Sequence, residues 1–124
     1  MTTTPAPAER LAESPGLTAC SLCAGETLGD LDPLPGGQLA RLRILQAKGV
    51  ARLTLSECLD ECNRGDVVVA RPTAAGRASG ARPVWFQRLA GDRVTDALGA
   101  WLGGGGPGLA QPPAELDAHV IDRS

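Results

Sequence analysis

The chain has 124 residues, of which 43% are hydrophobic and 21% are charged, and its formal net charge is −2. This length is sufficient for one domain with a sizeable core. The charge balance and the scarcity of aromatic residues argue against a nucleic-acid partner, which would need a basic surface or a stacking platform. No apolar run approaches the roughly 20 residues that a membrane span requires.

Residues 1–16, MTTTPAPAERLAESPG, are expected to form a disordered N-terminal arm. They lack the positive and apolar regions of a signal peptide, which predicts a cytoplasmic location. Structural disulfides are rare in that compartment. The four cysteines are therefore interpreted as metal-binding or redox residues: Cys20, Cys23, Cys58 and Cys62.

Residues 17–106 are expected to form the folded domain. Leu17–Cys20 is predicted as a short strand, and residues 23–37 as a loop because glycines and prolines interrupt regular structure. The next segment, QLARLRILQAKG (38–49), has the spacing of an amphipathic helix that Gly49 ends. Its predicted apolar side carries Leu39, Leu42, Ile44, Leu45 and Ala47, and its polar side carries Arg41, Arg43 and Lys48.

The second half of the domain is predicted as strands 50–55, 66–70 and 84–89, with 71–83 as the basic connection of an antiparallel hairpin. A helix follows, with Asp92 as its N-cap and four glycines after its end. Residues 107–124 are expected to be a C-terminal tail. The order β-α-β-β-β-α predicts an α/β layer architecture compatible with a thioredoxin-like core, with about four strands in a mixed sheet. The sequence leaves the strand order open.

The cysteines form two close pairs, C-x2-C at Cys20 and Cys23 and C-x3-C at Cys58 and Cys62. Each pair follows a predicted strand, so neighbouring strands would bring all four thiolates to one edge of the sheet. Soft thiolates select zinc, copper(I) or iron–sulfur clusters. A [2Fe–2S] cluster takes four cysteine ligands, and structural zinc can take the same number. The residue pattern alone leaves iron–sulfur and zinc equally open.

The stretch from Cys58 to Pro72, followed by RPVWF, resembles the second half-site of the thioredoxin-like [2Fe–2S] ferredoxins. That family includes the small iron–sulfur subunit on the flavoprotein arm of respiratory complex I. The chain is also similar to bacterial predicted metal-binding proteins in which C-x2-C opens the domain. One departure is Asp66, which stands where the family often has proline.

The resemblance covers residues 17 to 105 and implies a ferredoxin that transfers one electron between a reductase and an acceptor. It maps the [2Fe–2S] ligands onto Cys20, Cys23, Cys58 and Cys62, and it also implies homodimers. Backbone N–H groups of residues 24–25 and 59–64 are expected to donate to the sulfurs.

The residues around both cysteine pairs are acidic, and this favours a redox partner with a basic docking surface. The carboxylates are Glu57, Asp60, Glu61 and Asp66 around the second pair, and Glu26, Asp30 and Asp32 after the first. A solvated acidic loop would show the same pattern. No acid–base pair or nucleophile triad is found, so an enzyme is not expected. Two alternatives stay open: a structural or regulatory four-cysteine zinc module that binds another protein, and an iron–sulfur or metal delivery protein.

Overall fold

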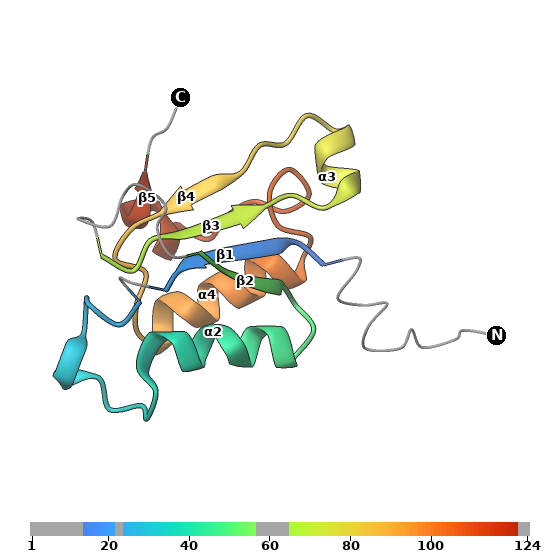
Figure 1. Ribbon diagram of the computed structural model, residues 1–124. Coiled ribbons are helices and arrows are strands. Elements are labelled where there is room, and N and C mark those ends of the chain that lie inside the picture. The colour runs from blue at the N-terminus through green and yellow to red at the C-terminus, as the bar shows by residue number, and fades with distance from the viewer. Residues whose placement is uncertain (1–13, 22–23, 57–64, 122–124) are drawn as a thin grey trace.

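The computed structural model describes residues 14–21, 24–56 and 65–121, which form a layered α/β fold as predicted (Figure 1). Their strands build one mixed sheet of five strands in the order β2-β1-β3-β4-β5. These are β1 (Gly16–Cys20), β2 (Arg52–Ser56), β3 (Val68–Arg71), β4 (Val84–Phe86) and β5 (Val120–Ile121). The helices are α2 (Gly37–Ala47), α3 (Ala74–Ala78) and α4 (Asp92–Gly103), with 3-10 helices η1 (Gly29–Leu31) and η3 (Ala114–His119). No helix of these described segments is long and apolar enough to cross a membrane.

Strand β1 pairs in parallel with the edge strand β2 and antiparallel with the central strand β3, and α2 provides the connection from β1 to β2. Strands β3 and β4 form the predicted antiparallel pair, with Val68 opposite Phe86. Helices α2 and α4 lie together on one face of the sheet (Figure 1). Since side chains alternate along a strand, Leu17 and Ala19 point into the core under these helices.

The main core joins this face of the sheet to α2 and α4. Phe86 and Trp101 meet edge to face, with ring centroids 5.9 Å apart and an interplanar angle of 79°. The indole Nε1–H of Trp101 donates to the carbonyl of Ala110 at 2.8 Å, so the polar end of this buried ring is satisfied. Beyond Ala110, Leu116 of η3 is fully buried in the same core. The predicted tail therefore contributes to the fold at this point, and β5 pairs with β4.

Helix α2 lies where it was predicted, but the predicted sides were wrong for Arg41, which is buried, and for Ile44 and Ala47, which are exposed. Its buried residues are Gln38, Arg41, Leu42 and Leu45, whereas Ile44 is 46% exposed and Ala47 is exposed. Arg41 is only 5% exposed because its guanidinium is fully engaged. Two of its nitrogens donate to Asp32 at 2.6 and 2.8 Å, and its Nε donates to Asp92 at 2.7 Å. A buried charge is tolerated when it is paired and hydrogen-bonded in this way.

The start of α4 also differs from the prediction. Its N-cap is Gly91, and Asp92 lies in the first turn, where its carboxylate accepts from Arg41. Gln38 holds the cap from α2: its Oε1 accepts from the N–H of Gly91 at 3.0 Å, and its Nε2 donates to Thr95 at 2.9 Å. The cap is thus fixed by a side chain from a neighbouring helix, which local sequence patterns do not reveal.

Two other segments depart from the predicted boundaries. The connection 71–83 contains the short helix α3, whose N-cap Thr73 accepts from the N–H of Gly76 at 3.1 Å. Strand β4 ends at Phe86 instead of residue 89. Arg88 has a φ of 52°, a left-handed conformation that a regular strand does not contain. The chain therefore turns away from the sheet directly after β4.

Acid should weaken the tie between Asp32 and Arg41. Hydrogen bonds from Arg41 hold the pKa of Asp32 below its ordinary value of 3.8. Because the folded pKa is depressed, the stabilisation is complete above the unfolded pKa and is lost as the pH falls through the folded pKa. We expect Asp32→Asn to reduce the unfolding free energy measured in urea at pH 7 and to narrow its difference between pH 7 and pH 3.

Asp30→Asn is the matched control, because Asp30 is an exposed aspartate of the same loop. It should leave the dependence of unfolding free energy on pH unchanged. An Asp32→Asn variant with the same acid dependence as the unmodified chain would contradict the role given to Asp32.

Candidate metal centre

Both cysteine-bearing segments begin at the same edge of the sheet. Cys20 is the last residue of β1 and pairs in register with Ser56, the last residue of the parallel strand β2. The N–H of Ser21 donates to the carbonyl of Ser56 at 2.7 Å. Cys58 follows Ser56 by two residues in the sequence. Strands β1 and β2 are therefore neighbours, which the two cysteine pairs require if they are to converge.

Of the four predicted ligands, Cys20 is described, and Cys23, Cys58 and Cys62 lie outside the described residues. Cys20 is 1% exposed and points away from the face that α2 and α4 cover, because it alternates with Ala19. It belongs to a small second core with Val67 and Ile121, against which Trp85 packs. On this side of the sheet it therefore contacts an apolar cluster, and its partner in register on β2 is Ser56.

Asp66 joins the residues that follow the two cysteine pairs. Its side chain accepts from the N–H of Gly25 at 2.7 Å and from the N–H of Thr27 at 2.8 Å, one donor on each oxygen. The residue is 2% exposed. The segment just after Cys23 is thus hydrogen-bonded to the segment just after Cys62, 41 positions away for the Gly25 contact.

The backbone at Gly65 and Asp66 makes this contact possible. Their φ angles are 72° and 43°, so two consecutive residues are left-handed, a conformation that glycine and aspartate accept more readily than most residues. The carbonyl of Gly65 accepts from the N–H of Arg88 at 2.7 Å, and that of Asp66 from Leu89 at 3.4 Å. This turn therefore connects the first loop, the entry to β3 and the exit from β4.

Three sequence expectations change in this region. The N–H of Ala24 donates to the carbonyl of Cys20 at 3.1 Å and that of Gly25 donates to Asp66, so both are engaged otherwise than predicted. Asp66 and Asp32 do not belong to a solvated acidic rim, because one is buried and the other pairs with Arg41. Glu26 and Asp30 are exposed as that reading requires.

The structure describes one soft donor at this edge of the sheet, the thiol of Cys20. Cys20 offers a thiol in an apolar environment at the edge where both cysteine segments start. Within residues 14–21, 24–56 and 65–121, no group of three or more His, Cys, Asp or Glu side chains is placed to hold a metal ion. A site here thus depends on Cys23, Cys58 and Cys62 joining Cys20.

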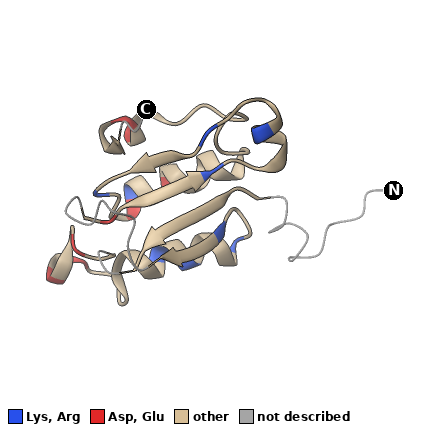
Figure 2. Cartoon of the chain, turned by 45° about the horizontal axis from the view of Figure 1, so that its top comes forward, with Lys and Arg blue, Asp and Glu red and all other residues tan. Residues whose placement is uncertain are grey.

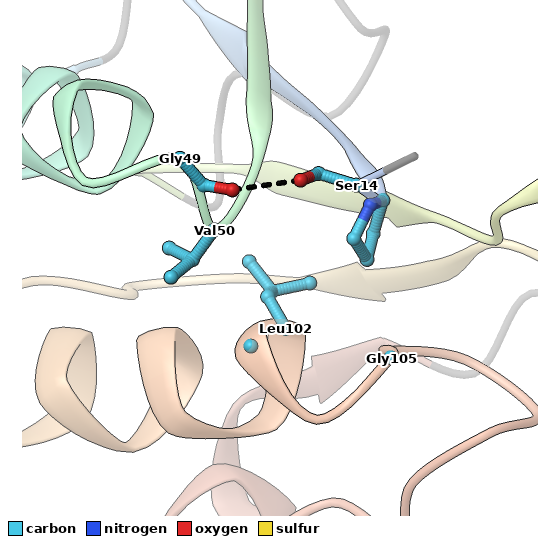
Figure 3. A pocket seen from close by; sticks show the side chains of 7 residues that line it. Ser14, Gly49, Val50, Leu102 and Gly105 are labelled. Atoms are coloured by element: carbon cyan, nitrogen blue, oxygen red, sulfur yellow. Dashed lines mark hydrogen bonds between the residues drawn. The ribbon is translucent and has the colours of Figure 1, made fainter. Parts of the chain in front are cut away.

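A pocket of about 260 Å³ lies at the opposite end of β1 and β2 (Figure 3). Val50 and Leu102 face it, and Ser14 closes one side by donating from Oγ to the carbonyl of Gly49 at 2.7 Å. Its lining contains no thiol and no charged side chain. Among its described lining residues, the one polar side chain is that of Ser14, whose hydroxyl is hydrogen-bonded to Gly49.

Comparisons of the chain with family models, with curated proteins and with solved structures found no match.

We expect Asp66→Asn to detach the first loop from the turn before β3. An amide keeps one acceptor and places an N–H₂ donor against the second backbone N–H, while asparagine still accepts the left-handed φ. Losing one hydrogen bond to a charged acceptor should cost roughly 1.5–3 kcal/mol of unfolding free energy. Hydrogen exchange of the Gly25 and Thr27 amides should accelerate relative to the unmodified chain, as measured by NMR.

Asp30→Asn removes the same charge from an exposed position and controls for a general electrostatic effect. Equal exchange rates at Gly25 and Thr27 in Asp66→Asn and in the unmodified chain would show that the carboxylate does not hold the loop.

Proposed function

We propose that the chain is a [2Fe–2S] ferredoxin of thioredoxin-like fold that carries one electron between a reductase and an acceptor protein. The cluster ligands would be Cys20, Cys23, Cys58 and Cys62. One observation supports this most strongly: the two cysteine-bearing segments are tied to each other where they begin and again where they end. The first tie is the pairing of Cys20 with Ser56, and the second is the carboxylate of Asp66.

Because the cysteines are close in sequence to these two contacts, chain connectivity limits how far their sulfur atoms can lie from them. Cys58 is two residues after Ser56, Cys23 is one residue before Ala24, and Cys62 is three residues before Gly65. Neighbouring Cα atoms are about 3.8 Å apart, so chain connectivity allows the Cα atom of each cysteine to lie no more than three such steps from a described position. This limit is compatible with four thiols that meet at metal–sulfur distances of about 2.3 Å.

The finer assignment of the fold is supported by the order of elements. Helix α2 lies between the parallel strands β1 and β2 in the sequence. Helix α4 follows the antiparallel strands β3 and β4 and packs against the same face of the sheet as α2. The neighbouring positions of β1 and β3 in the sheet support the proposal of a thioredoxin-like domain. Strand β5 is an addition at the β4 edge.

When bound, the cluster would supply the one-electron chemistry, and the chain would hold it, shield it and present it to partners. Val67, Ile121 and Trp85 would form part of the apolar shell, which limits water and so affects the reduction potential. Outside this shell, Glu26 and Asp30 are exposed, and Leu31, the last residue of η1, is 88% exposed. Two carboxylates beside an exposed leucine suit a small docking contact with a basic partner.

The composition of the site is tested by purifying the protein without exposure to air. We expect a red-brown protein with two irons and two sulfides per chain, whose visible absorption bleaches and whose EPR signal develops when dithionite reduces the cluster. Elemental analysis and EPR measure these quantities. A colourless protein with one zinc and no acid-labile sulfide would reject the ferredoxin and support the four-cysteine zinc module.

The ligand role of Cys20 is tested by Cys20→Ser, which replaces the sulfur by a harder oxygen donor. The visible absorption and EPR spectra should shift or disappear, while far-UV circular dichroism reports whether the sheet is retained. Ser21→Ala is the matched control, because it changes an adjacent exposed side chain and leaves the sulfur in place. A folded Cys20→Ser protein with an unchanged spectrum would remove Cys20 from the ligand set.

A further inference from the structure

The sheet face opposite α2 and α4 carries a polar groove of about 600 Å³ across β2, β1 and β3. It is lined by side chains that alternate with those of the main core. Its polar groups are two guanidiniums and three hydroxyls, which belong to Arg52, Arg71, Thr18, Thr54 and Ser56. Apart from its contact with Ser56, this groove lies outside the proposed cluster site.

Strand register places the two arginines on either side of a glycine. Gly16 pairs with Arg52 of β2 in one direction and with Arg71 of β3 in the other. Residues paired in register point to the same face of a sheet, so both guanidiniums rise from the groove with only the backbone of Gly16 between them. Gly16 has no side chain, and the aliphatic part of Arg71 lies over it: a Cβ atom at Gly16 would be 3.4 Å from Cβ and 3.6 Å from Cδ of Arg71.

The next row of the groove supplies hydroxyls. Thr18 pairs with Thr54, and Thr18 is 6% exposed. The Nε of Arg71 donates to Oγ1 of Thr18 at 3.1 Å, which directs its guanidinium along the sheet face. In the part of the chain that the structure describes, no carboxylate forms an ion pair with Arg52 or Arg71.

Among the residues that the structure describes, the groove is lined by two arginines and by no carboxylate. In Figure 2 the described acidic positions gather mainly toward one end of the fold, whereas basic positions are spread along its length. A net charge of −2 is therefore compatible with a positive surface at the groove. A groove of this size is within the range of small-molecule sites, about 300–1,000 Å³, and larger than a bare ion needs.

From this geometry we propose that the groove binds the phosphate group of a small phosphorylated organic molecule. Two guanidiniums can each donate a pair of hydrogen bonds to a phosphate dianion, and they match its charge. The hydroxyls of Thr18 and Thr54 add donors along the floor. The proposal requires no metal, so it stands or falls separately from the cluster at the other end of β1.

Isothermal titration calorimetry at fixed ionic strength tests the site with inorganic phosphate, glycerol 3-phosphate and acetate as probes. Glycerol 3-phosphate should bind more tightly than inorganic phosphate, and acetate more weakly than either. Arg52→Gln and Arg71→Gln should each weaken phosphate binding at least about tenfold, the effect of losing one good charge-assisted hydrogen bond. Thr54→Val should weaken it several-fold without any change in charge.

Arg43→Gln is the matched control, since Arg43 is an exposed arginine of α2 on the other side of the sheet. It should leave binding unchanged. Equal weakening by Arg43→Gln and Arg52→Gln would mean non-specific attraction to positive charge and would overturn the site, as would an absence of binding at millimolar probe. Preferential binding of acetate would overturn the phosphate assignment. The same titration on Cys20→Ser should give the unmodified affinity, which separates this result from the fate of the cluster.

Discussion

The arrangement of the cysteine edge depends on one buried carboxylate. Asp66 accepts backbone N–H groups from Gly25 and Thr27, and an ionised carboxylate is the side chain suited to this because both of its oxygens only accept. Burial at 2% exposure removes water as a competing partner, so these two bonds replace its solvation. Proline at this position would provide no acceptor. The aspartate therefore joins the two segments by a side-chain contact that a purely backbone turn does not make.

A second polar tie acts at the far end of the same loop. Residues 24–36 contain no buried apolar side chain, so hydrophobic burial does not fix their path. Asp66 holds the start of this loop, and the pair of Asp32 with Arg41 holds its end. Arg41 reaches from the buried side of α2 and also contacts Asp92 at the start of α4. The position of the first loop is thereby coupled to the packing of the two helices, although the loop itself contributes nothing to the core.

These long-range side-chain contacts explain which parts of the fold and of the candidate site could be predicted from the sequence. Local sequence patterns were enough to place β1, α2, β3 and α4, since the two helices have apolar side chains at helical spacing and the two strands are short, almost continuously buried runs. It gave the wrong side for Arg41, because an arginine was assigned to solvent when its partners, Asp32 and Asp92, are 9 and 51 residues away. Asp66 was grouped with surface acids for the same reason. The register of the strands could not be predicted from the sequence either. The pairing of Gly16 with both Arg52 and Arg71 shows that two arginines distant in sequence share one groove.

The two ends of β1 have opposite chemical character on the same face of the sheet. Gly16 lies between arginines, and Cys20, four residues on, lies in an apolar cluster with Val67 and Ile121. At about 3.3 Å per residue, four residues separate the two ends by roughly 13 Å. That distance exceeds the screening length of about 8 Å at physiological ionic strength. An anion at the arginine end would therefore perturb a cluster at the cysteine end only weakly in the cell, and the acidic residues near the cysteines would not repel it strongly. The two proposed sites, which differ in the charge they require, could therefore lie at opposite ends of one short strand.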